Sequence, residues 1–331
     1  MELWIRLDAN PSIGFGHLVR MSALASAATA RGWKVKLFTT SRITINLPTS
    51  VELNYVDSEQ QLLNQSLINK PEWLFIDGYH FTQQQCEIFN RVADQLAHID
   101  DLQQAYQLDS QLLVSPNGEA FKAFYCETFP RAELLLGLPY VLLRSEFEQG
   151  FLNYSERKIA LVSFGGADVA NLSWDAVEAL ISAGFTDIHL VVTDAMNINL
   201  NNTNLAKVTL HRNLSAKEMA NLMGRAKIAM GAAGSTMFEL ASQGVPSVFA
   251  IVADNQVTAA CELEASGWCL AFDIRVGSAK QQLSDKLDCL LASDLSQMHN
   301  FAKQTVDVYG PKRIITAMER ISRSNRDIRQ V

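Results

Sequence analysis

Cysteine pairs at metal-binding or disulfide spacing are missing from this sequence. Its five cysteines are odd in number, dispersed along the chain, and form no Cys-x-x-Cys pair. A disulfide framework or a zinc ribbon needs such pairs. No His-x-x-x-His pair or compact His/Cys/carboxylate set replaces them. We therefore expect reduced thiols that pack as small apolar side chains, and no metal or other cofactor.

The chain also lacks an excess of positive charge, a basic leader and a long apolar run. Its 28 Lys and Arg residues are outnumbered by 35 Asp and Glu residues, which gives 331 residues a net charge of −7. This balance argues against nucleic acid or an anionic membrane as the main partner. No apolar run reaches the roughly 18 residues of a membrane span, and no signal peptide precedes the first strand-like residues. We expect a soluble, cytoplasmic protein without a membrane span.

The motifs of three common enzyme classes are absent. No glycine-rich loop ends in Gly-Lys-Ser/Thr, so a P-loop ATPase is disfavoured. No Gly-x-Gly-x-x-Gly fingerprint is present either, which argues against an enzyme that binds NAD(P). A Gly-x-Ser-x-Gly elbow is also missing, which argues against a serine hydrolase.

What the sequence does contain is a regular alternation of strand-like and helix-like segments. This pattern is typical of parallel α/β sheets. In the first half, we expect strands at 3–7, 33–39, 51–56, 73–77 and 96–100. In the second half, we expect strands at 158–164, 188–193, 207–211, 228–231 and 246–252. After residue 266 we expect helices alone, the last one at 311–323.

The polar, glycine-interrupted stretch 146–157 divides these two similar halves. We therefore expect two Rossmann-like domains of ordinary size, 1–150 and 151–331, which face a central cleft. In this division, the final helix is a candidate to pack against the first domain rather than the second.

The most informative stretch of the first half joins its first strand to its first helix. There, Gly14 and Gly16 flank a turn that lets the backbone approach a ligand closely. His17 follows directly, and histidine is the side chain whose ordinary pKa suits proton transfer near neutral pH. Arg20 lies one turn further along the same helix face. The alternative reading makes His17 a structural or helix-capping residue.

Further polar residues follow the strands of the first half, where parallel sheets bind ligands. Asp8 and Asp77 end two strands, and Tyr79 and His80 come next in the chain. Arg144 follows a later apolar run and is expected in the same region. Asp100 and Asp101 are candidates for a magnesium site or, more commonly, for capping a helix. Tyr79 is equally well read as a half-buried aromatic.

In the second half, Gly234, Ser235 and Thr236 precede a helix, and a glycine-rich turn with hydroxyls there suits a phosphate. Glu239, about one turn later, is placed to accept from ribose hydroxyls. An ordinary capped core helix is the alternative. A second glycine turn is a further phosphate or sugar candidate, and its alternative is a simple strand–helix turn. The start of a later helix could hydrogen-bond a sugar, and its alternative is a helix capped by Asp254. Their residues are Gly165, Gly166, Asp168 and Asn171, and then Asn255 and Gln256.

These motifs together resemble a known enzyme family. They occur in that family's order as Arg6-x-Asp8, Ile13-Gly14-x-Gly16-His17-x-x-Arg20, Ile76-Asp77-Gly78-Tyr79, Ile99-Asp100-Asp101-Leu102, Leu142-Leu143-Arg144-x-Glu146-Phe147, Phe164-Gly165-Gly166-Ala167-Asp168-x-x-Asn171, Gly234-Ser235-Thr236-x-x-Glu239, Gly244-x-Pro246, Asn255-Gln256 and Val306-Asp307-x-x-Gly310. The family is that of the UDP-2,4-diacetamido-2,4,6-trideoxy-β-L-altropyranose hydrolases of pseudaminic acid biosynthesis, with the related spore-coat polysaccharide proteins.

The resemblance implies a GT-B architecture and a metal-independent hydrolase that cleaves the anomeric C1–O bond of a UDP-sugar with inversion. It implies that His17 activates water, with Tyr79 and Asn255 in support. Gly234, Ser235 and Thr236 would hold the diphosphate and Glu239 the ribose. The sequence departs from the family at Gly78, where a polar residue is common, and at His80, which leaves the identity of the hexose open.

Three other functions fit parts of the same pattern. A GT-B glycosyltransferase with a UDP-N-acetylhexosamine donor, similar to the enzyme that glycosylates lipid-linked muramyl peptide, would need an acceptor surface that this acidic first half does not suggest. A hydrolysing UDP-N-acetylglucosamine 2-epimerase is a second alternative. A non-catalytic nucleotide-sugar sensor would tolerate loss of His17. For the oligomeric state we expect a monomer or a weak dimer.

Overall fold

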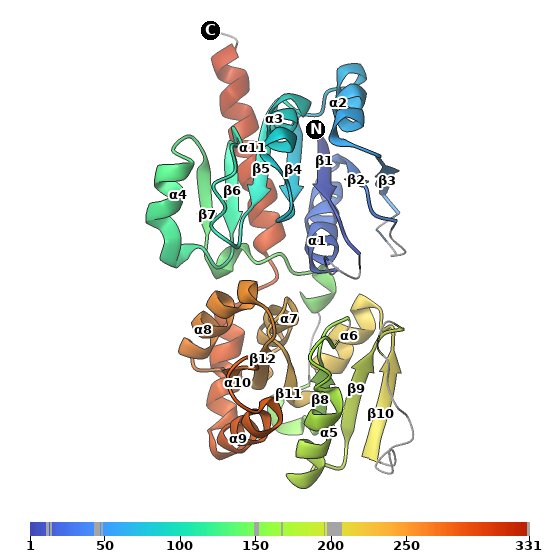
Figure 1. The fold of residues 1–331 in the computed structure, drawn as a ribbon, viewed down its shortest axis with the longest axis vertical. Coiled ribbons are helices and arrows are strands. Elements are labelled where there is room, and N and C mark those ends of the chain that lie inside the picture. The colour runs from blue at the N-terminus through green and yellow to red at the C-terminus, as the bar shows by residue number, and fades with distance from the viewer. Residues whose placement is uncertain are drawn as a thin grey trace. The chain divides into compact units, whose positions relative to one another are not determined.

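The computed structural model describes residues 1–10, 13, 15–42, 47, 49–148, 152–166, 168–194, 196 and 207–329. The chain divides into two compact units (Figure 1). Unit 1 comprises Met1–Arg144 together with Tyr309–Val331, and unit 2 comprises Ser145–Val308. The sequence-based boundary at 150/151 therefore lies a few residues beyond the division between Arg144 and Ser145. Of the helices in the described residues, none combines the length and hydrophobicity needed to span a bilayer.

Unit 1 is built on a parallel sheet of seven strands in the order β3-β2-β1-β4-β5-β6-β7. The strands are β1 (Glu2–Leu7), β2 (Lys34–Thr39), β3 (Val51–Tyr55), β4 (Trp73–Asp77), β5 (Gln95–Ile99), β6 (Leu112–Ser115) and β7 (Glu133–Leu136). The helices are α1 (Gly16–Ala30), α2 (Glu59–Ile68), α3 (Gln83–Val92), α4 (Lys122–Thr128) and α11 (Gly310–Arg329). Strands β1 and β4 are almost entirely buried, including the charged residues Arg6 and Asp77, because helices cover the sheet on each side.

Helix α11 belongs to unit 1 although it follows the whole of unit 2 in the sequence. It lies beside α1. Its residues Ile314, Ile315 and Met318 are fully buried in the core of unit 1, together with residues of β1 and α1. The indole Nε1 of Trp73 on β4 donates a hydrogen bond to Ser322 Oγ over 2.8 Å. Unit 1 is thus completed by a distant part of the chain.

Unit 2 repeats the design with a six-stranded parallel sheet in the order β10-β9-β8-β11-β12-β13. Its strands are β8 (Ile159–Ser163), β9 (Ile188–Val192), β10 (Val208–Arg212), β11 (Ala226–Ala232), β12 (Ser247–Ile251) and β13 (Cys269–Asp273). Its helices are α5 (Ser173–Ser182), α6 (Ala216–Met223), α7 (Thr236–Ser242), α8 (Val257–Ala265), α9 (Ala279–Ala292) and α10 (Leu295–Thr305). The expectation of two Rossmann-like α/β domains is confirmed.

One expectation about secondary structure is wrong. Residues after 266 are not all helical, because Cys269–Asp273 forms β13 and pairs in parallel with β12 from Ser247↔Cys269 to Ile251↔Asp273. The segment has no apolar–polar alternation and contains no β-branched residue. Its strand conformation therefore depends on the free edge of β12, a partner that local sequence does not reveal. Strands β6 and β7, four residues each, were likewise not expected.

Candidate functional site

Each sheet reverses its strand order at one place, between β1 and β4 in unit 1 and between β8 and β11 in unit 2. Such a reversal opens a crevice beyond the carboxyl ends of the strands, and α/β proteins bind ligands there. The register of Leu7↔Asp77 places the loops after β1 and β4 next to each other. These two loops and the first turn of α1 supply Asp8, His17, Tyr79 and His80, so these sequence candidates of unit 1 gather at its switch point.

His17 and Asp77 form a buried pair at this point. His17 lies in the first turn of α1, which follows β1, whereas Asp77 is the last residue of β4. The distance from His17 Nδ1 to Asp77 Oδ1 is 2.6 Å, and the two residues are 6% and 0% exposed. The sequence showed Asp77 as an acidic residue at a strand end and in a family motif, but not as the partner of His17, which is 60 residues away.

The charge on Asp77 assigns the tautomer of His17. Burial acts to raise the pKa of Asp77, but the Arg20 guanidinium and His17 outweigh it and lower the pKa to about 2. An ionised carboxylate only accepts hydrogen bonds, so Nδ1 of His17 carries the proton that it donates to Asp77. The lone pair of the neutral ring then lies on Nε2, which has no hydrogen-bond partner among the described residues. This is the arrangement of a general base.

Arg20 joins this pair to a second acidic residue. Its Nε donates to Asp77 Oδ2 over 2.6 Å and its Nη1 to Asp101 Oδ2 over 2.5 Å. The hydroxyl of Tyr79 donates to the same Asp101 oxygen over 2.6 Å. The ring of Tyr79 meets the ring of His17 edge to face, with 4.7 Å between centroids. Arg20 and Asp101 therefore hold Tyr79 against His17, and the guanidinium is engaged by carboxylates within unit 1.

The pKa values in this cluster fix its ionisation state near neutrality. Burial raises the pKa of Tyr79, and Asp101 and Asp77 raise it further against the opposing charge of Arg20, so the hydroxyl stays protonated. Burial lowers the pKa of Arg20, but Asp101 and Asp77 outweigh it and raise the value. The cluster thus presents a neutral phenol, a cation and ionised Asp77 around His17.

Asp8, which directly follows β1, is the centre of a second group of polar residues at the same sheet edge. Its Oδ1 accepts from Thr39 and Thr40, and its Oδ2 lies 2.9 Å both from Arg6 Nη2 and from His80 Nε2. Asp8 is 4% exposed. Burial acts to raise its pKa, but the hydrogen bonds from His80 and Arg6 lower it well below its usual range. Asp8 is therefore an anion fully engaged by protein groups.

The remaining candidates of unit 1 have different surroundings. A Cβ at Gly16 would meet nothing within 4 Å, so the start of α1 is open to a ligand. Gly14 lies outside the described residues. Arg144 is half-buried at the end of the first segment of unit 1. Asp100 accepts backbone N–H groups from Leu102 and Gln104, a loop-capping role.

In unit 2, the loops after β8, β11 and β12 line adjacent positions at one sheet edge. A Cβ at Gly165, Gly166 or Gly234 would meet nothing within 4 Å. At Gly231, in contrast, a Cβ would lie 2.3 Å from the backbone oxygen of Ser163, so glycine allows β11 and β8 to approach. The glycines beyond the strands leave open backbone surface there, as a bound phosphate requires.

The polar candidates of unit 2 divide into engaged and open side chains. Asp168 accepts the N–H groups of Leu172 and Ser173 over 3.0 Å each, so its carboxylate caps the start of α5. Asn171 donates its backbone N–H to the Asp168 carbonyl oxygen over 2.8 Å and has a positive φ of 52°. Gln256 Oε1 accepts from Val252 N over 2.9 Å. Asn255 is exposed, and its side chain makes no hydrogen bond to a described residue.

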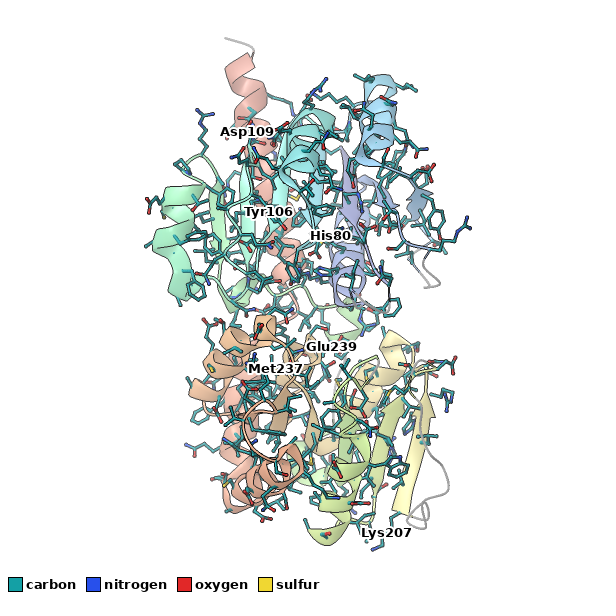
Figure 2. All side chains as sticks on the ribbon, in the orientation of Figure 1. His80, Tyr106, Asp109, Lys207, Met237 and Glu239 are labelled. Atoms are coloured by element: carbon teal, nitrogen blue, oxygen red, sulfur yellow. The ribbon has the colours of Figure 1, made fainter. Side chains whose placement is uncertain are left out.

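The phosphate-loop candidates lie at α7. Ser235 is exposed and Thr236 half-exposed at the helix start, and neither hydroxyl hydrogen-bonds to a described residue. Glu239 is 6% exposed within the same helix, and Figure 2 labels it near Met237. The roles assigned to all these residues remain predictions.

Two arrangements were not expected from the sequence. Across the neighbouring strands β9 and β10, His189 Nδ1 lies 2.8 Å from His211 Nε2 with the rings stacked, although 22 residues separate the two in the sequence. Asp101 was noted as a possible ligand or cap but not as the residue that links Arg20 to Tyr79. Among the described residues, no group of three His, Cys, Asp or Glu side chains is arranged to hold a metal ion.

Comparison with known proteins supports the fold and suggests a chemistry. No protein-family model matches the chain. A UDP-2,4-diacetamido-2,4,6-trideoxy-β-L-altropyranose hydrolase from Campylobacter jejuni is 27% identical over 203 residues, which cover 60% of this chain and 72% of the relative. This is the family whose motifs the sequence resembles.

Solved structures extend the likeness to nearly the whole chain. MurG from Acinetobacter baumannii has a TM-score of 0.65 at 13% identity, covering 96% of this chain and 99% of that one. MnaA from S. aureus, solved with UDP, has a TM-score of 0.64 at 15% identity, covering 95% and 94%. The protein therefore has the GT-B fold of two Rossmann-like domains.

Proposed function

We propose that this protein hydrolyses the anomeric C1–O bond of a UDP-linked 2,4-diacetamido-2,4,6-trideoxyhexose and releases UDP and the free sugar for nonulosonic acid biosynthesis of the pseudaminic type. The observation that carries the proposal is the buried His17–Asp77 pair at the β1/β4 switch point. It supplies an oriented general base whose Nε2 lone pair is available to water.

In the reaction, Nε2 of His17 takes a proton from a water molecule as the water oxygen bonds to C1 of the sugar. The C1–O bond to the diphosphate breaks with inversion, and its electron pair leaves with UDP. Asp77 stabilises the imidazolium that forms, because it lies 2.6 Å from Nδ1. UDP needs little protonation as a leaving group, so one base and neutralisation of the diphosphate suffice.

Two further residues support this step. Tyr79, a neutral phenol packed edge-on against His17, restricts the ring of the base. In unit 2, Asn255 has an exposed side-chain amide, suited to hydrogen bonds with the sugar. We assign the diphosphate to Gly234, Ser235 and Thr236.

The rest of the binding set follows the family resemblance. Glu239 is assigned to the ribose of the nucleotide. Asp8 and Arg20 act by holding neighbouring groups, given the partners that they have in unit 1. The proposal needs no metal or other cofactor. The 27% identity to the Campylobacter hydrolase supports this substrate class.

The test is UDP release from UDP-2,4-diacetamido-2,4,6-trideoxy-β-L-altrose by wild type and His17→Phe, with EDTA and without an acceptor. We expect rapid release by wild type and a loss of about 10²-fold or more in the variant. In water enriched with oxygen-18, the label enters the sugar if the C1–O bond breaks and UDP if the phosphorus–oxygen bond breaks. Label in UDP, or release unaffected by His17→Phe, contradicts the proposed mechanism.

A GT-B glycosyltransferase is the second candidate, because the likeness to MurG covers 96% of this chain. A transferase releases UDP from a UDP-N-acetylhexosamine only when an acceptor is present. Release that depends on an added acceptor therefore identifies a transferase, whereas tight UDP-sugar binding with no release under either condition identifies a sensor.

A further inference from the structure

The switch point of unit 1 holds two histidine–aspartate pairs in a reciprocal arrangement. His17 follows β1 and bonds to Asp77 at the end of β4. His80 follows β4 and bonds to Asp8 just after β1, over 2.9 Å. Because β1 and β4 are hydrogen-bonded neighbours, both imidazoles belong to the same sheet edge. The first pair is explained by the proposed hydrolysis, and the second is not.

The partners of Asp8 determine which way the His80 ring presents its nitrogens. Asp8 is an ionised carboxylate that accepts from Thr39 and Thr40 on one oxygen and from Arg6 on the other. It can only accept from His80, so Nε2 of His80 carries a proton. In the neutral ring Nδ1 is then a hydrogen-bond acceptor, and it has no partner among the residues that the structure describes.

Exposure separates His80 from a purely structural histidine. Its side chain is 40% exposed, whereas the Asp8 side chain that holds it is 4% exposed. Asp8 already has Arg6 and two threonines as partners, so its charge does not depend on His80 alone. Figure 2 labels His80 in unit 1 beside the lower part of β1 and β4. A ring with one nitrogen anchored and an exposed face suits a ligand contact.

The position of the ring is fixed by its neighbours. His80 packs on Phe81 with 4.4 Å between ring centroids, and Phe81 is 6% exposed. A Cβ at Gly78 would lie 2.7 Å from Phe81 Cε2 and 3.2 Å from His80 Cε1. Glycine at position 78 therefore makes room first for the Phe81 ring on which His80 packs and also for His80 itself, which links the two departures of this sequence from the family it resembles. An anchored ring loses little conformational entropy when a ligand binds.

We propose that His80 is a sugar-binding residue, whose Nδ1 accepts a hydrogen bond from a donor of the hexose, an acetamido N–H or the single ring hydroxyl. This inference rests on the proposed function, because it takes the UDP-sugar as the ligand. His80 then selects for the sugar at a position where His17 acts on C1. Because the nucleotide is assigned to unit 2, we expect binding of UDP alone to be independent of His80.

The variants His80→Gln and His80→Asn test this assignment. Glutamine retains an N–H donor that reaches Asp8 but removes the Nδ1 acceptor, whereas asparagine retains a polar atom near the Nδ1 position and loses the bond to Asp8. Affinities for the UDP-sugar and for UDP alone are measured by calorimetry in a His17→Asn background, where turnover is expected to be slowed by about 10²-fold or more. His80→Gln is expected to weaken UDP-sugar binding about tenfold, the size of one hydrogen bond, and to leave UDP binding unchanged.

The outcomes separate this inference from the proposed hydrolysis. Equal UDP-sugar affinity with histidine or glutamine at position 80 overturns the role of His80, whether or not wild type releases UDP. A loss for UDP and UDP-sugar alike also overturns it, because it indicates a general structural defect. If the sugar-dependent loss is found but wild type releases no UDP, the inference stands and hydrolysis is rejected. A smaller loss in His80→Asn than in His80→Gln supports Nδ1 as the contact atom.

Discussion

The substitution Asp77→Asn tests the base most directly, because Asp77 accepts from both His17 and Arg20. Oδ1 accepts from His17 Nδ1 and from Arg20 Nη2, and Oδ2 accepts from Arg20 Nε. An amide has one oxygen and one NH₂ group. With its oxygen toward Arg20 Nε, the NH₂ group faces His17 Nδ1 and drives the proton to Nε2, which removes the base. With its oxygen toward His17, the NH₂ group opposes Arg20 Nε.

Either orientation costs activity, by different amounts. Loss of the correct tautomer removes general-base catalysis, which contributes about 10² to 10⁴-fold, or roughly 3 to 5.5 kcal/mol of activation free energy. In the second orientation the tautomer is kept, but the imidazolium formed in the reaction loses its anionic partner. We therefore expect kcat to fall by at least about 10²-fold with little change in KM, because neither orientation alters a group assigned to the nucleotide.

The assay is UDP release under saturating UDP-sugar, with thermal unfolding to show that the variant is folded. Asp101→Asn is the matched control, since it removes one negative charge beside Arg20 but leaves the His17–Asp77 bond in place. Its loss is expected to be under about tenfold, consistent with one side-chain hydrogen bond. A folded Asp77→Asn enzyme with kcat within threefold of wild type would refute the reasoning about the tautomer.

Three further predictions follow from other contacts. Gly234→Ala is expected to leave the melting temperature unchanged, because the added Cβ meets no protein atom within 4 Å, but to weaken UDP binding, because the Cβ enters the space assigned to the phosphate. Gly231→Ala is expected to lower the melting temperature, because its Cβ would lie 2.3 Å from a backbone oxygen. Unchanged UDP affinity in Gly234→Ala would contradict the phosphate role. Burial raises the pKa of Asp100 to about 6, so its contribution to stability is present below pH 4 and is lost as pH rises through 6. The unfolding free energy of wild type relative to Asp100→Asn should thus rise by about 3 kcal/mol from pH 7.5 to 4 in urea titrations, and a pH-independent difference would contradict this. Glu59→Gln leaves the buried guanidinium of Arg6 without its bidentate partner and should lower the unfolding free energy by about 3 kcal/mol, measured the same way; a loss below 1 kcal/mol would contradict this.

Much of the fold could be predicted from the sequence because its strands are locally encoded. In runs such as Trp73–Asp77, apolar residues are followed by one acidic residue at the end, and a segment of helical length comes next. Helix α6 likewise begins at a capping box of Ser215 with Glu218, a pattern that four consecutive residues encode. These features depend on neighbours in the chain. Strand β13 depends instead on the edge of β12, which only the folded sheet provides.

The site was predictable in its members but not in its connections. His17, Tyr79 and Asp8 were recognised from their places after strands. That His17 pairs with Asp77 and His80 with Asp8 follows from the strand order, in which β4 lies beside β1 although two strands separate them in the sequence. Arg20 was placed on the helix face of His17, but its bonds to two carboxylates of unit 1 join residues that lie 57 and 81 positions away in the sequence.

The place of α11 has a consequence for how the protein is made on the ribosome. Residues 309–329 emerge only after all of unit 2 has been synthesised, yet Ile314, Ile315 and Met318 fill the core of unit 1. Unit 2 is a single continuous segment, Ser145–Val308, and can fold as soon as it leaves the exit tunnel. The usual order of N-terminal domain first is thereby reversed. During synthesis, the part of the unit 1 core that α11 covers beside α1 therefore stays exposed until residues 309–329 have emerged.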